Sequence, residues 1–432
     1  MNLHSLVRRN ITHFWPVNLA VIGGVAVAVA VLAGALVVGS SVRASLRALA
    51  LERLGSIDQV VTSVGFVRET FSDELMTADG MTANFGAAAP IVAVEGFITH
   101  QASGRRASGV QVYGVDERFW TFHGVAADAR VIDRNAVFVS EGLASELGAV
   151  IEDSLLIRVE KPSAVPISSL HGRRDDVGQT LRLGVARVLS PAELGEFSFR
   201  PQQGLARSVF VSLARLQRDL GQDRHVNTIL LSVQGEQQDD GTGDSVRLST
   251  AEAAVRSVAR LEDLGLRLRA LPEHQTVAVE SAAGLLNDEI TKAVESTAEM
   301  MELRLEPVFT YLANGLRVDN RTTPYSLVTA LNLSMLVNGV PEAREGFSPV
   351  VLNRWAADDL DVSVGDSLAL DYYVWEDEGR LVTRETELRV ADIVPIAGAA
   401  DDQDLAPDYP GITEATDVTD WDPPFEIDLD LI

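Results

Sequence analysis

A single uncharged segment near the amino terminus constrains this chain more than any other feature. Residues Leu19–Val38 are apolar throughout. Twenty helical residues at 1.5 Å each span about 30 Å, the thickness of the hydrocarbon core of a bilayer. Phe14 and Trp15 precede the segment, where they would lie at the lipid headgroups, a depth that favours aromatic side chains. The sequence therefore predicts a transmembrane helix over residues 17–39.

The alternative to a permanent membrane helix is a cleaved signal peptide. Arg8 and Arg9 would form its basic region, and Gly39 and Ser41 would supply the small residues of a cleavage site. The apolar part of a signal peptide spans about 7–15 residues, and the segment here is longer, which favours the membrane helix. The charges do not settle which end of the membrane helix faces the cytoplasm, because two arginines precede the span and three follow closely.

A second uncharged stretch, Thr322–Val340, is an alternative candidate for a membrane span. It contains Pro324, Asn332 and Asn338, and its apolar residues form only short runs. Short runs of this kind are typical of buried strands, so we predict strands here and a single membrane span in the chain.

Composition excludes several classes of function. The net charge of −26 argues against a nucleic-acid partner, because binding phosphates requires a positive field. The absence of cysteine excludes disulfides, thiolate zinc sites and cysteine nucleophiles. The two lysines, Lys161 and Lys292, follow Glu160 and Thr291, so the chain has no Gly-Lys-Ser/Thr loop for ATP.

No sequence motif for catalysis was found either. There is no His-Glu-x-x-His, no Gly-x-Ser-x-Gly, and no Gly-x-Gly-x-x-Gly after a strand. We therefore predict that the protein is not an enzyme and assign no catalytic, cofactor-binding or metal-binding residue; residues that bind a substrate are unknown from the sequence. The seven histidines are dispersed: His4, His13, His100, His123, His171, His225 and His274.

The most informative feature after the membrane segment is an internal duplication. Residues 136–159 align without a gap to residues 349–372, and Asp153-Ser154-Leu155 matches Asp366-Ser367-Leu368. Each copy predicts a strand, a short helix, a tight turn and a second strand. Such a unit cannot bury both of its faces alone, so we expect the copies to pack together in one small β lobe. Residues 209–220 repeat the strand and helix more weakly.

The remaining pattern predicts an α+β fold with two lobes. A helix over 41–54 prolongs the membrane helix, residues 91–99 and 110–115 form a hairpin, and a long amphipathic helix lies within 284–316 with Met300 and Met301 in its core. The predicted domains are an N-terminal segment (1–16), the transmembrane helix (17–39), a helical extension with the first strands (40–90), a β-rich lobe with the first repeat (91–233), a linker (234–248), a mixed lobe (249–340), the second repeat (341–396) and a solvated acidic tail (397–432).

These residues together suggest a family. The order is a basic N-terminus, one membrane helix, a helix ending in Arg53-Leu54-Gly55, and then β lobes. The lobes contain the motifs Tyr113-Gly-Val-Asp-Glu-Arg-Phe-Trp120, Val137-Phe-Val-Ser-Glu-Gly-Leu-Ala144 and Val364-Gly-Asp-Ser-Leu368. This pattern resembles the MacB/FtsX/LolE-type ABC transporter permeases, specifically their first membrane helix and periplasmic core domain. Thr310-Tyr-Leu-Ala-Asn314 with Pro324-Tyr-Ser326 is similar to a large FtsX-like subfamily.

The resemblance implies a permease-type subunit, or its N-terminal part, in the cell inner membrane. It implies a cytoplasmic N-terminus, a periplasmic location for the bulk of the chain, and a separate cytoplasmic ATPase whose hydrolysis drives extrusion, lipoprotein release or activation of a partner. Further partners are membrane lipid and either a second permease copy or the remaining permease helices. Family members carry at least three more membrane helices, and we expect these to be encoded beyond Ile432. The alternative function is a single-pass anchored periplasmic scaffold or binding protein that is independent of ATP.

Overall fold

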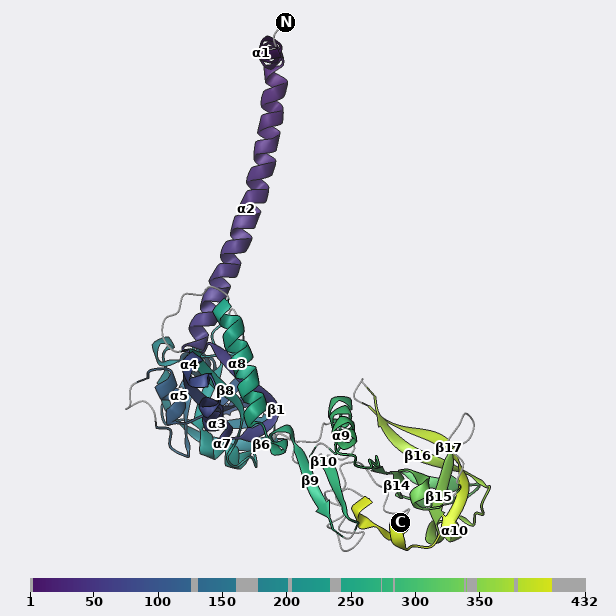
Figure 1. Cartoon of the computed structure of the whole chain (residues 1–432). Coiled ribbons are helices and arrows are strands. Elements are labelled where there is room, and N and C mark those ends of the chain that lie inside the picture. Colours follow the sequence, from purple (N-terminus) through teal and green to yellow (C-terminus); the bar gives the residue numbers. More distant parts are fainter. Residues whose placement is uncertain are drawn as a thin grey trace. The chain divides into compact units, whose positions relative to one another are not determined.

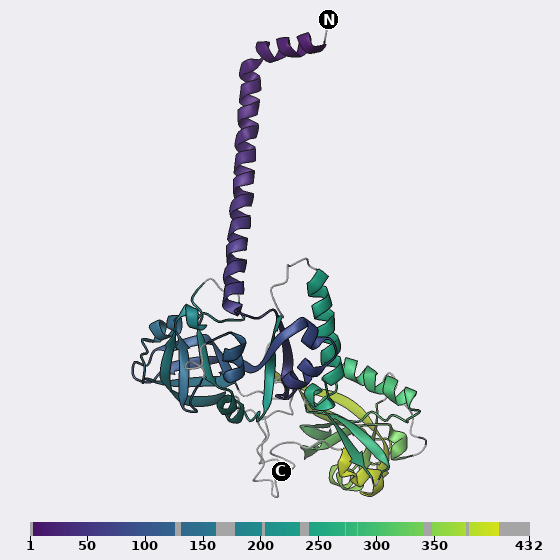
Figure 2. The same ribbon diagram turned by 60° about the vertical axis from the view of Figure 1, so that its left-hand side comes forward.

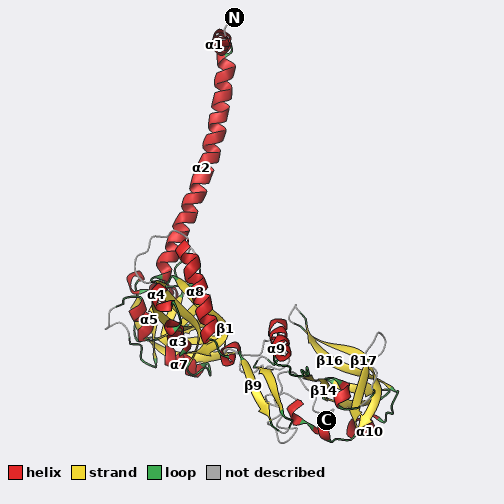
Figure 3. Ribbon diagram, viewed as in Figure 1, coloured by secondary structure: helices red, strands yellow, loops and turns green. Residues whose placement is uncertain are grey.

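The computed structural model describes residues 3–125, 131–160, 178–200, 204–233, 242–272, 274–282, 284–337, 339, 348–376 and 380–405. The chain divides into two compact units, which are described separately. Unit 1 comprises Met1–Glu160 and Gln179–Val258, and unit 2 comprises Lys161–Gly178 and Ala259–Ile432. Figure 1 labels the elements, and Figure 3 shows that both helices and strands occur, as the predicted α+β class requires.

Unit 1 begins with two helices. The short α1 (Leu3–His13) turns into α2 (Trp15–Leu54), an unbroken helix of 40 residues (Figure 2). Pro16 lies in the first turn of α2, where its missing N–H costs no hydrogen bond. The predicted transmembrane helix and its predicted extension are therefore one helix, and its side chains from Leu19 to Val38 are exposed. Within the described residues it is the one helix long and apolar enough to cross a membrane.

The core of unit 1 is a sheet of eight strands in the order β1-β8-β2-β3-β7-β4-β6-β5. An extra pairing between β2 and β5 closes six of these strands into a ring. The long β2 makes this possible, because its first half pairs with β8 and its second half with β3 and β5. The strands are β1 (Gln59–Arg68), β2 (Phe85–His100), β3 (Arg106–Val115), β4 (Ala136–Ser140), β5 (Ser154–Glu160), β6 (Gly178–Leu189), β7 (Ser208–Ser212) and β8 (His225–Val233). The predicted hairpin is β2–β3.

Short helices cover this sheet, and aromatic side chains fill one part of its core. Tyr113, Phe119, Trp120, Phe197 and Phe210 are each almost fully buried in a single cluster. The helices are α3 (Phe71–Thr77), α4 (Met81–Asn84), α5 (Glu117–Phe122), α6 (Glu141–Leu147), η2 (Pro191–Glu193), α7 (Leu213–Asp219) and α8 (Thr242–Val258). Since α8 starts at Thr242, the predicted linker over 234–248 is helical in its second half; residues 234–241 lie outside the described part.

Unit 2 contains smaller sheets. A five-stranded sheet has the order β13-β12-β16-β17-β15, and two further sheets pair β9 with β10 and β11 with β14. The strands are β9 (Leu266–Leu271), β10 (Thr276–Ser281), β11 (Phe309–Leu312), β12 (Gly315–Val318), β13 (Arg321–Pro324), β14 (Leu327–Ala330), β15 (Pro349–Asn353), β16 (Ser367–Trp375) and β17 (Leu381–Val394). The helices are η3 (Leu261–Leu264), α9 (Asp288–Met300), η4 (Leu333–Met335), α10 (Arg354–Leu360), η5 (Gly398–Asp401) and η6 (Gln403–Leu405). Strands β13 and β14 overlap the uncharged stretch Thr322–Val340, so the prediction of strands there is confirmed.

The duplication is confirmed down to single hydrogen bonds. Strand β4, helix α6 and strand β5 correspond to β15, α10 and β16. In both copies the first strand runs parallel to a third strand and carries a register shift one residue after its conserved valine. In both turns an aspartate oxygen accepts a backbone N–H at 2.8 Å, from Val150 to Asp153 and from Ser363 to Asp366. The expectation of one shared lobe was wrong, because the copies belong to different sheets in different units.

Two further expectations for unit 2 were wrong. Helix α9 ends at Met300, and the side chains of Met300 and Met301 are 78% and 63% exposed, so this pair is not helix core. The apolar spacing continued past the helix, but Glu302 has a positive φ of 55°, which ends it. The predicted acidic tail is also not wholly solvated: residues up to Leu405 form η5 and η6, and η6 accepts hydrogen bonds from β9 and β11.

Candidate functional site

The described feature best placed to connect the membrane with the folded domain is the C-terminal end of α2. Arg53 lies in the last turn of this helix, and only 6% of its side chain is exposed. Its Nη2 donates to Oε2 of Glu196 at 2.8 Å and to the carbonyl of Gly204 at 2.7 Å. The same Glu196 oxygen accepts the backbone N–H of Ala206 at 3.0 Å. One guanidinium therefore fixes the helix end to the segment that leads into β7.

A second contact lies two and three residues further along the chain, at Gly55 and Ser56, just past the end of α2. Gly55 has a φ of +62°, and a Cβ at this position would lie 2.7 Å from Nδ1 of His123. Glycine is therefore required here for both conformation and space. The backbone N–H of Ser56 donates to the same Nδ1 at 3.2 Å.

His123 accepts this hydrogen bond because it is neutral. Burial lowers the pKa of His123 from its ordinary value to about 4, since the charged imidazolium would lose its hydration. The ring packs edge-on against Phe119, Phe122 and Phe197, with ring centroids 4.7–5.5 Å apart. The end of the membrane helix thus contacts the aromatic core directly.

The helix that carries His123 is itself tied to neighbouring elements. Asp116 caps the start of α5 by accepting the N–H of Arg118 at 2.9 Å. Burial alone would lower the pKa of the Arg118 guanidinium, but its hydrogen bonds and ion pairs with Asp116 and Glu69 raise it overall, so the charge persists. Glu69 also accepts from Gln217 of α7 at 2.9 Å. This network joins the end of β1, α5 and α7 into one block.

Sequence reasoning identified one part of this site and missed the rest. Arg53-Leu54-Gly55 was recognised as a motif, and the structure places all three at the junction. Glu196 and His123 were not singled out, since their roles depend on partners 143 and 67 residues away. The motif from Tyr113 to Trp120 proves to be structural: its aromatic residues are core and its Asp116 and Arg118 are cap and ion pair.

These features define a class: a membrane-anchored α+β protein whose apolar helix continues, without a break, into a buried attachment within a β-rich domain. Residues 19–248, more than half of the chain, match the model of the MacB-like periplasmic core domain, and the chain belongs to this family. Such a domain points to a permease-type component of an ABC transporter.

Two further comparisons add little. Among curated proteins no sequence match was found. One solved structure, the periplasmic region of MacB from Actinobacillus actinomycetemcomitans, is similar over 54% of this chain and 84% of that chain, with 9% identity and a TM-score of 0.27. That score is too low to support any detail.

Proposed function

We propose that this chain is the permease-type subunit, or part of one, of an ABC transporter, and that α2 transmits conformational change across the membrane. In this proposal the N-terminus is cytoplasmic, α2 crosses the inner membrane, and both units are periplasmic. A separate cytoplasmic ATPase supplies the energy. ATP hydrolysis drives extrusion, lipoprotein release or activation of a partner. The complex is completed by membrane lipid and by either further permease helices or a second permease copy.

The observation that supports this role most directly is the attachment of α2 through Arg53. A membrane anchor that only tethers a domain needs no buried contact at its outer end, and a flexible linker would serve. Here the helix extends beyond the membrane length by about 15 residues, or roughly 20 Å. It then ends in a buried charge-assisted contact rather than in a loop. A displacement of the helix would therefore be passed to the domain and not lost in a linker.

Co-purification tests the partner. The full chain, tagged and expressed in its native host with the neighbouring locus intact, is expected to recover an ATPase subunit. Repeated failure to recover one would overturn the proposal and would favour the anchored scaffold that acts without ATP.

A pair of substitutions tests the coupling itself. Ser45→Pro breaks α2 in its exposed outer part, because proline removes a helical hydrogen bond and clashes with the preceding turn. We expect the recovered complex to keep its ATPase partner but to lose its transport or activation function. Ser45→Ala is the matched control and should retain function. Equal function in both variants would show that the outer half of α2 does not transmit motion.

A further inference from the structure

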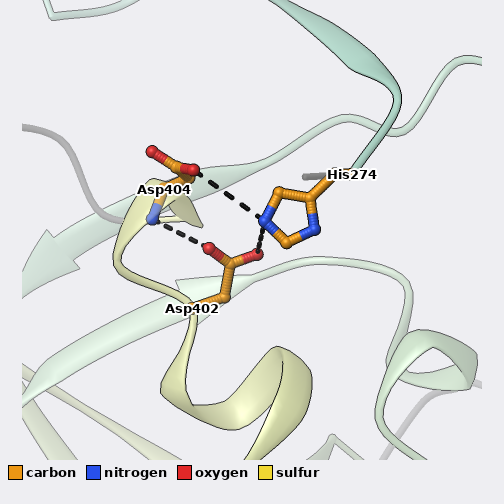
Figure 4. Close-up of side chains that lie close together, drawn as sticks. All are labelled: His274, Asp402 and Asp404. Atoms are coloured by element: carbon orange, nitrogen blue, oxygen red, sulfur yellow. Dashed lines mark hydrogen bonds and ion pairs between the residues drawn. The ribbon is translucent and has the colours of Figure 1, made fainter. Parts of the chain in front are cut away.

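Unit 2 contains a cluster of side chains of the kinds that bind metal ions, whereas the α2 junction belongs to unit 1. His274, in the turn between β9 and β10, faces Asp402 and Asp404 from the η5–η6 segment (Figure 4). Its Nε2 lies 3.3 Å from Oδ2 of Asp402 and 3.8 Å from Oδ2 of Asp404. The three ligand atoms all lie within 4.8 Å of one another, although His274 is 128 or more positions from the two aspartates in sequence.

A single proton does not satisfy this arrangement. Nε2 carries at most one hydrogen, yet two carboxylate oxygens face it. A zinc ion bound at 2.0–2.1 Å by nitrogen and oxygen would place its tetrahedral ligands about 3.3–3.4 Å apart. The two distances from Nε2 lie within about 0.5 Å of that spacing, and the two carboxylate oxygens lie within 4.8 Å of each other, so small side-chain movements would bring the three atoms around a small cation.

The other oxygens of the two carboxylates already have partners. Oδ1 of Asp402 accepts the backbone N–H of Asp404 at 2.9 Å, and Oδ1 of Asp404 pairs with Arg269. Arg269 is itself held by Glu280 at 2.7 Å, which offsets its charge. Each carboxylate therefore has its Oδ2 left to bind an ion between the three side chains. The partners of Oδ1 orient the carboxylate, as partners of metal ligands commonly do.

The backbone around the cluster is fixed from two sides. The hairpin β9–β10 carries His274, and its six residue pairs are in regular antiparallel register. The carbonyl of Leu405 accepts the hydroxyl of Thr310 in β11 at 2.7 Å, next to Asp404. The ligands are thus presented by ordered segments and not by one flexible loop.

We propose that His274, Asp402 and Asp404 bind a divalent transition metal, with zinc as the preferred ion. One imidazole and two carboxylates suit zinc or manganese better than calcium or magnesium, which favour oxygen ligands alone. The side chains are partly exposed, so water fills the fourth position and the ion can enter from solvent. The ion cross-links the hairpin to the η5–η6 segment, a function that disulfides cannot perform in a chain without cysteine.

Zinc binding to the full chain tests this directly. The detergent-solubilised protein is treated with a chelator, dialysed, and titrated with ZnCl₂, MnCl₂ and CaCl₂ by calorimetry. We expect one equivalent of zinc to bind in the micromolar range or tighter, with calcium at least tenfold weaker, and zinc to raise the melting temperature.

Variants distinguish the site from adventitious binding. His274→Ala and Asp402→Asn should each weaken zinc binding by more than tenfold, while Asp401→Asn, a neighbouring acid outside the cluster, should not. Both cluster variants should remain folded, because His274 lies at an exposed turn, and urea unfolding without metal verifies this. Zinc affinity weaker than millimolar, or equal affinity in wild type and His274→Ala, would overturn the proposal and leave a histidine–aspartate ion pair. Neither outcome depends on an ATPase partner.

Discussion

At the scale of single residues, two buried polar groups determine how α2 meets its domain. Arg53 brings a full positive charge into the protein, where it is satisfied by the Glu196 carboxylate and the Gly204 carbonyl. His123 brings a neutral ring that accepts the Ser56 N–H. Removing Arg53 leaves the partly buried Glu196 carboxylate without its charged donor, and such a loss usually exceeds the net value of the bond itself.

Arg53→Ala tests the first group. We expect it to lower the free energy of unfolding by about 1–3 kcal/mol, because Glu196 and Gly204 lose their shared donor. Arg207→Ala is the matched control, since Arg207 pairs with Glu146 at 2.7 Å with both side chains much more exposed. That control should cost less than about 1 kcal/mol. Urea unfolding of both variants makes the comparison, and equal losses would show that burial of Arg53 has no special weight.

The pKa of His123 gives a pH dependence with a definite sign. Its folded pKa of about 4 lies below the ordinary histidine value, so between these values the unfolded chain binds a proton that the folded chain does not. Stability is therefore complete above about pH 6.5 and falls as the pH drops towards 4, by roughly 3 kcal/mol in total. His123→Gln should reduce this slope in urea unfolding from pH 4.5 to 7, whereas His13→Gln, at an exposed position, should leave it unchanged.

At the scale of elements, the duplicated unit shows one local structure in two environments. The two strands of the first copy, β4 and β5, are members of the closed ring of unit 1. Strand β4 pairs with β6 on one side and with β7 on the other. The second copy lies in an open sheet, where β15 is the end strand within the described residues. Both copies keep the aspartate turn, and in both a side chain caps the short helix, Ser140 for α6 and Asn353 for α10. The turn and the cap are therefore encoded locally and do not depend on the neighbouring strands.

Exchange of one turn residue between the copies is a direct test. Gly148 and Asp361 occupy the same position after the short helix, both in the left-handed region, with φ of 65° and 55°. We expect Asp361→Gly to stabilise the protein by about 0.5–1 kcal/mol and Gly148→Asp to destabilise it by about 1 kcal/mol, because only glycine adopts this conformation without strain. Denaturant midpoints measure both, and changes of the same sign would refute the equivalence of the two turns.

At the scale of the whole molecule, the proposed topology puts both units on the same side of the membrane. Reporter fusions after residue 60 and after residue 380 should therefore report the periplasm, and a fusion at the N-terminus the cytoplasm. The expectation follows from one candidate span among the described residues. Opposite locations for the two later fusions would require a second crossing between them.

The sequence predicted what depends on local pattern and missed what depends on distant partners. The length of the apolar segment predicted α2, two apolar runs on either side of a polar turn predicted the β2–β3 hairpin, and the gapless match predicted the repeats. The placement of the repeats in separate sheets was not predictable, since strand order is set by long-range pairing. The same is true of Arg53 with Glu196 and of His274 with Asp402, where each residue alone is an ordinary charged or polar side chain.

The length of α2 has a mechanical consequence for unit 1. In the proposed topology about a third of its roughly 60 Å lies beyond the bilayer, so the helix would act as a lever that pivots at the membrane surface. A tilt of about 10° there would carry the outer end sideways by roughly 4 Å. Arg53 fastens that end to the chain before β7. The sideways displacement passed to unit 1 would therefore grow with the number of helical turns between the bilayer and the domain.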